Sequence, residues 1–157
     1  LTRLDYGCAM LAGCPAYLLD KLQSVMNAAA RLVCSARKFD HVTPLHRELH
    51  SLRVPQRIAF RLAVYAYRCQ HGLAPPYLSA DIRRVADADS RRRLRSASTA
   101  ELLVPSTNHV TIGDRAFPVA AARAWNSLPP YVTSSPSLPV FRSRLKTELF
   151  ARSFDAV

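Results

Sequence analysis

Three segments of the chain repeat their apolar residues at the three- and four-residue steps of an α-helix, and this spacing constrains the fold more than any other feature. The segments are residues 15–33, 55–71 and 138–152, and each pairs an apolar face with a polar one. Apolar residues make up 49% of the 157, which is enough for a domain with a core of its own. The pattern predicts a mainly α fold, built as a small helical domain.

Breaks in this pattern divide the chain into four parts. Residues 1–36 form a helical segment that we expect to continue upstream of residue 1, and residues 37–85 form a second helical region. Residues 86–100 have almost no large apolar side chains and are predicted to be a basic flexible linker. Residues 101–157 are predicted to hold a minor β-hairpin followed by two helices. The two strands of that hairpin would be residues 102–104 and 110–112.

The helix predicted over residues 55–71 carries a line of arginines. At about 100° per residue, Arg57, Arg61 and Arg68 fall within roughly 40° of one another, and Arg53 would lie in line with them if it were helical. An isolated line of this kind is usually a solvated helix face. Here the predicted linker adds four more arginines, so the line belongs to a larger basic surface. The four are Arg91, Arg92, Arg93 and Arg95.

The charge balance indicates the class of partner. Lysine and arginine number 22 against 11 acidic residues, which gives a formal net charge of +11, and 19 of the 22 cations are arginine. The planar guanidinium matches phosphate oxygens, so this balance favours a polyanion. We expect RNA or DNA to be bound through phosphates with little sequence specificity, because no base-reading motif is present. The predicted contact residues are Arg53, Arg57, Arg61, Arg68, Arg91, Arg92, Arg93 and Arg95.

Two aromatic residues near these cations have the chemistry to stack on nucleic-acid bases. They are Phe60 and Tyr67, both within the predicted central helix. Their positions are nevertheless more typical of side chains that pack in the core or at its margin.

No pattern of catalytic residues is found, so we expect no enzymatic activity and no catalytic residue in this chain. The 11 carboxylates are scattered, whereas a metal-dependent polymerase pairs its carboxylates to hold Mg²⁺. The four glycines are isolated from one another, which argues against a phosphate-cradling loop. His46 and His50 are four residues apart without an evident third ligand, and we interpret them as two surface histidines. We therefore expect no metal, no cofactor and no small-molecule substrate.

Cysteine and charge spacing bear on the cellular compartment. The closest cysteines, Cys8 and Cys14, are too far apart for a zinc-binding pair, and all four are interpreted as reduced. The uncharged stretch at residues 8–19 is 12 residues long, holds Gly13 and Pro15, and is too short to span a bilayer, so we expect no membrane partner. The first residues lack an initiating methionine and a signal pattern, as expected of a piece of a longer protein. We expect an intracellular protein, nuclear or cytoplasmic and not secreted.

A series of short blocks runs in order along nearly the whole chain. In the first half of the chain the blocks are RLDY at 3–6, LLDKLQSV at 18–25, NAAARLV at 27–33, DHVTPLHRELH at 40–50 and PQRI at 55–58. Further along they are HGLAPPYL at 71–78, GDRAF at 113–117, AWNSLP at 124–129 and FRSRLKTELF at 141–150. Together these blocks resemble the region downstream of the polymerase core in the reverse transcriptases of jockey-like non-LTR (LINE-type) retrotransposons.

The resemblance implies a place for the chain within a larger protein. The parent would carry an endonuclease and an RNA-directed DNA polymerase upstream, the latter using Mg²⁺, and would copy its RNA into a nicked genomic target. This chain would be the C-terminal part, beginning near a thumb-like region. Its partners would be RNA or DNA and the upstream polymerase domain. The family's catalytic aspartates have no counterpart here, so the chain would grip template RNA or target DNA without a catalytic centre of its own.

Two departures from the family pattern leave alternatives open. Residues 5–8 read DYGC where family members read DYCN, and residues 50–53 read HSLR where they read HWLP. Such changes also suit a non-functional translated relic of the element. A further alternative is a protein-interaction module, in which the apolar faces of the helices at 18–33 and 138–152 dock on the polymerase core and the arginines only solubilise the chain.

Overall fold

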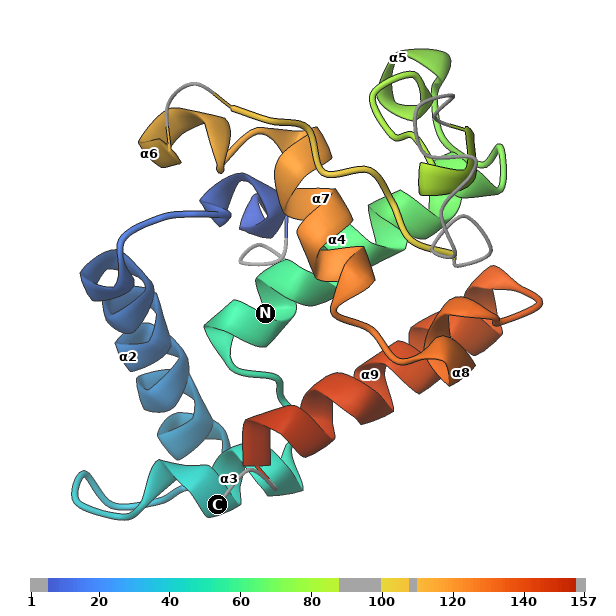
Figure 1. Cartoon of the computed structure of the whole chain (residues 1–157). Helices are drawn as coiled ribbons and strands as arrows, with labels where there is room; N and C mark the ends of the chain where they lie inside the picture. Colours follow the sequence, from blue (N-terminus) through green and yellow to red (C-terminus); the bar gives the residue numbers. More distant parts are fainter. Residues whose placement is uncertain (1–5, 88–99, 108–109, 155–157) are drawn as a thin grey trace.

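The computed structural model describes residues 6–87, 100–107 and 110–154, and the regular secondary structure within them is helical apart from one isolated antiparallel bridge, Arg84 to Leu102 (Figure 1). The predicted mainly α fold is confirmed. The α-helices are α2 (Ala16–Val33), α3 (Val42–Glu48), α4 (Val54–Gln70), α5 (Pro76–Ser79), α6 (Val110–Gly113), α7 (Phe117–Asn126), α8 (Pro130–Thr133) and α9 (Leu138–Phe154). Two 3₁₀-helices are η1 (Cys8–Leu11) and η2 (Val85–Asp87).

Helix α4 lies at the centre of the fold, in contact with α7, α9, η1 and α2 (Figure 1). Its first turn holds Pro55, where a missing backbone N–H costs no hydrogen bond, and Arg53 before it is extended. Gly72, with a φ of +66°, ends the helix, and the Leu73 N–H donates to the Arg68 carbonyl oxygen at 2.8 Å. The helix therefore begins and ends within one residue of its predicted bounds.

Three buried rings join α4, α7 and α9, and we call them the ring cluster: Tyr67, Trp125 and Phe141. The Phe141 ring lies 4.4 Å from that of Tyr67 and 5.7 Å from that of Trp125, centroid to centroid. The Tyr67 hydroxyl donates to the Ser135 carbonyl oxygen at 3.1 Å, and the Trp125 indole N–H donates to the Ala100 carbonyl oxygen at 2.8 Å. The cluster thus buries large apolar surfaces, while the Tyr67 hydroxyl and the Trp125 indole N–H each keep a hydrogen-bond acceptor.

The predicted β-hairpin is wrong. Residues 110–112 lie in α6, and Leu102 instead bridges to Arg84. The side chain of Asn126 accepts a hydrogen bond from the Leu102 N–H and donates one to the Leu102 carbonyl oxygen, both at 2.9 Å. Because a side chain of α7 already satisfies these two backbone groups, they are not available to pair with residues 110–112.

Helix α2 forms where predicted but turns a different face to the core. Met26 is buried, whereas the apolar Val25 and Leu32 are 57% and 81% exposed. The polar face predicted for residues 15–33 includes Gln23 and Asn27, which are half-buried here and hydrogen-bonded to each other at 2.9 Å. Further hydrogen bonds join them to α3 and α4. These bonds draw the polar side inward, so an apolar stripe is left outside.

The structure bears on several other predictions from the sequence. The short helix α8 lies between α7 and α9 and is additional to the two helices predicted for residues 101–157. Most of the predicted basic linker, residues 88–99, lies outside the described residues. All four cysteines are thiols, as predicted. Within the described ranges, no helix combines the length and the apolar character needed to cross a membrane.

Removing the central ring of the cluster should destabilise the whole fold. We expect Phe141→Ala to lower the free energy of unfolding by about 3–5 kcal/mol, because the side chain is fully buried and its loss leaves a cavity. Phe39→Ala is the matched control, because this ring is 90% exposed, and it should change stability by less than about 0.5 kcal/mol. Urea denaturation followed by circular dichroism measures both, and equal losses would contradict the central role of the cluster.

Candidate nucleic-acid interface

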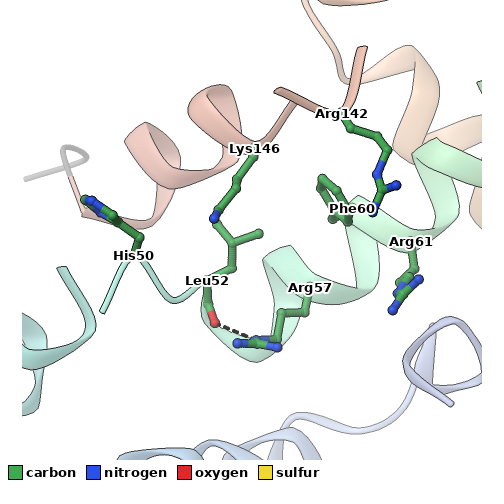
Figure 2. Close-up of a pocket in the computed structure, with 7 residues that line it drawn as sticks. All are labelled: His50, Leu52, Arg57, Phe60, Arg61, Arg142 and Lys146. Carbon is green, nitrogen blue, oxygen red and sulfur yellow. Dashed lines mark hydrogen bonds between the residues drawn. The ribbon is translucent and has the colours of Figure 1, made fainter. Parts of the chain in front are cut away.

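A hollow bounded by α4, α9 and the segment that joins α3 to α4 is lined by basic side chains, and we call it the basic groove (Figure 2). Its volume is about 300 Å³. Of the seven described residues that line it, four are lysine or arginine, two from each helix, and none is acidic. The lining residues are His50, Leu52, Arg57, Phe60, Arg61, Arg142 and Lys146.

Helix α4 supplies Arg57 and Arg61, which are one helical turn apart. The orientation of Arg57 is fixed by two hydrogen bonds to the segment before the helix. Its Nε donates to the Leu52 carbonyl oxygen at 3.0 Å, and a terminal guanidinium nitrogen donates to the Ser51 hydroxyl oxygen at 3.0 Å (Figure 2). Of the predicted contact residues, these two arginines are the ones that the structure brings together in the groove.

Helix α9 supplies Arg142 and Lys146, which are also one turn apart and are exposed. Each directly follows a residue that is 0% exposed, Phe141 and Leu145 respectively, so the core anchors the helix beside them. These two cations are not among the contact residues predicted from the sequence. The sequence shows that they are spaced one turn apart beside an apolar stripe, but the helix that they face is decided by how α9 packs against α4.

Two further predicted contact residues that the structure describes, Arg53 and Arg68, do not line the groove. Arg53 is the N-cap of α4 and has an extended backbone, so the helical conformation that would place it in line with the other arginines is not formed. Its guanidinium lies 5.4 Å from the centroid of the Phe154 ring. Arg68 donates from Nε to the Leu73 carbonyl oxygen at 3.1 Å, at the end of α4. Arg91, Arg92, Arg93 and Arg95 lie outside the described residues.

The two aromatic candidates for base stacking differ in how far they are buried. Tyr67 is 1% exposed and its ring is stacked on those of Phe141 and His71, so it cannot receive a base. Phe60 is half-buried: it packs against the hydrophobic core and also lines the basic groove. Of this pair, therefore, Phe60 alone is placed to meet a ligand.

A polar network joins α2, α3 and the start of α4 near the groove. His46 is 3% exposed, and its Nε2–H donates to Asn27 Oδ1 at 2.9 Å, because that oxygen can only accept. The Gln23 amide donates to the same oxygen at 2.9 Å and accepts from the Val54 N–H, also at 2.9 Å. The network therefore fixes where α4 begins relative to the two preceding helices.

Burial also determines the protonation state of His46. Desolvation first, and then the positive charges of Arg53 and Arg57, lower the pKa of His46, so the ring is neutral at pH 7. The interpretation of two surface histidines is therefore wrong for His46. His50 is exposed and lies beyond the end of α3, so the two histidines are not a pair on one helix face. Among the described residues, no group of three or more histidine, cysteine, aspartate or glutamate side chains is placed to hold a metal.

Comparison of the chain with protein-family models, with curated proteins and with solved structures gives no match. The resemblance to retrotransposon reverse transcriptases therefore depends on the sequence blocks alone. The physical argument for a function depends on the basic groove.

The stability of the fold should decrease as the pH falls through the range in which histidine titrates. An unfolded histidine takes up a proton below about pH 6.5, whereas folded His46 resists protonation, so the unfolded state gains protons first and is favoured. We expect a lower free energy of unfolding near pH 5.5 than near pH 7.5 for the unmodified chain. In His46→Gln this pH dependence should be smaller, even if the variant is less stable throughout.

His41→Gln is the matched control for this experiment, because His41 is exposed at the start of α3. It should retain the pH dependence of the unmodified chain in urea titrations at both pH values. An undiminished pH dependence in His46→Gln would show that another group is responsible.

Proposed function

We propose that the chain is the nucleic-acid-binding C-terminal part of a non-LTR retrotransposon reverse transcriptase, which holds template RNA or target DNA by phosphate contacts and has no catalytic centre of its own. The sequence blocks supply the family, and the basic groove is the observation that supports the binding. Four cations from two helices line one hollow, and the ring cluster holds those helices together. Concentrated positive charge of this kind attracts a polyanion.

The arrangement of the cations suits an extended chain of phosphates. On each helix the two cations are four residues apart, which places their Cβ atoms roughly 5–6 Å from each other. Arg57 and Arg61 form one row, and Arg142 and Lys146 form the other. The arginine forks suit bidentate contacts with phosphate oxygens, whereas Lys146 contributes a compact charge.

The chemistry of the lining favours binding over catalysis. The groove presents N–H donors and positive charge, and its seven lining residues include no carboxylate. Such a set can hold phosphate oxygens, but it does not provide the carboxylate ligands with which a polymerase holds Mg²⁺.

The exposed face of α2 favours the protein-interaction alternative. Leu18, Val25 and Leu32 are 39%, 57% and 81% exposed, and they recur every seven residues along the helix. The other half of that alternative is wrong, because the apolar face of α9 is buried: Phe141 and Leu145 are 0% exposed. Docking on the polymerase core would therefore use α2 and not α9.

Neutralising the groove should weaken the binding of nucleic acid in a salt-dependent way. For the variant Arg61→Ala/Arg142→Ala/Lys146→Ala, we expect the slope of log Kd against log salt on single strands to fall by about 2, at roughly 0.7 for each phosphate that the groove no longer neutralises. Arg57 is left in place because it also bonds to the segment before α4. Fluorescence anisotropy with labelled single- and double-stranded RNA and DNA measures the slope.

The matched control is Lys21→Ala/Arg37→Ala/Lys38→Ala, which removes the same charge from exposed positions that do not line the groove. Its slope should change by less than half as much. If the two variants lower the slope equally, the groove is not the binding site. If the folded chain binds no better than an unrelated basic protein, the docking function on α2 is favoured instead.

A further inference from the structure

Phe60 lies in the basic groove together with both pairs of cations. Figure 2 shows its ring beside the Arg142 side chain of α9, whereas Arg57 and Arg61 line the same hollow but extend from α4 in another direction. The side chain is half-buried, and its packing against the hydrophobic core fixes its position. An aromatic ring and several cations that line one hollow are the combination by which proteins hold unpaired nucleotides.

The position of the Phe60 ring favours a single strand over a duplex as the ligand. In a duplex the bases are stacked on one another, and the phosphates are the groups that a groove of cations can reach. A single strand has bases whose faces are free, and one of them can lie on an aromatic side chain while the flanking phosphates meet the cations.

The size of the hollow also fits this mode of binding. Its volume of about 300 Å³ lies at the small end of the range for pockets that hold small molecules, which suits one unit of a strand. Leu52 adds a second apolar group to the lining, which favours a ligand that brings an apolar surface as well as charge.

We propose that the basic groove binds single-stranded nucleic acid, with one base stacked on Phe60 and the neighbouring phosphates held by Arg57, Arg61, Arg142 and Lys146. This inference rests on the proposed function and adds the state of the ligand to it. Every base has an aromatic face that can stack on Phe60, so the site has little preference for sequence.

The test compares two oligomers that carry the same number of phosphates. One is a labelled strand of roughly twelve thymidines, and the other is a strand of equal length in which every base is replaced by an abasic site. We expect the full 157-residue chain to bind the thymidine strand about 5- to 150-fold more tightly, which is the contribution of one stacked base. Phe60→Leu should remove this difference without changing the affinity for the abasic strand, whereas Phe60→Tyr, which keeps a ring, should retain it.

Phe39→Leu is the matched control, because Phe39 is an exposed ring with the Lys38 ammonium 5.7 Å from its centroid but lies outside the groove. It should leave the difference intact. Equal binding of the two oligomers by the unmodified chain overturns the proposal without any variant, and so does a difference that survives Phe60→Leu. A failure of the proposed function looks different: the triple variant of the groove would then bind the abasic strand as tightly as its charge-matched control does.

Discussion

The stacking of Phe141 on Tyr67 and Trp125 is the contact on which the rest of the structure depends. It joins α9 to the central helix α4 and to α7, three segments that lie far apart in the sequence. Many of the other helices in the described part of the chain are one or two turns long, and such helices have little stability of their own. Burial of these large rings therefore supplies much of the driving force that orders their surroundings.

The functional surface is a consequence of this packing. Because Phe141 and Leu145 are fixed in the core, Arg142 and Lys146 are fixed on the adjoining side of α9. The same holds on α4, where the buried Ile58 directly follows Arg57. The core thus gives the cations a defined place, and a fixed site loses less entropy when it binds a ligand.

Local sequence was sufficient to predict the long helices, the ends of α4 and the shared position of Arg57 and Arg61, because all of these follow from periodicity and from proline and glycine signals. It was not sufficient where a distant partner decides the outcome. Asn126 takes the backbone groups of Leu102 that a hairpin would need, and the Gln23 and Asn27 hydrogen bonds turn α2. The contribution of α9 to the groove likewise depends on tertiary contacts that no local pattern encodes.

The central claim is that nucleic acid lies between α4 and α9, and photo-cross-linking tests it most directly. A single strand containing 4-thiothymidine would be bound to the unmodified full-length chain, irradiated and digested, and the cross-linked peptides identified by mass spectrometry. We predict cross-links in the α4 peptide that contains Phe60 and Arg61 and in the α9 peptide that contains Arg142 and Lys146. Cross-links confined to residues outside both peptides would contradict the account.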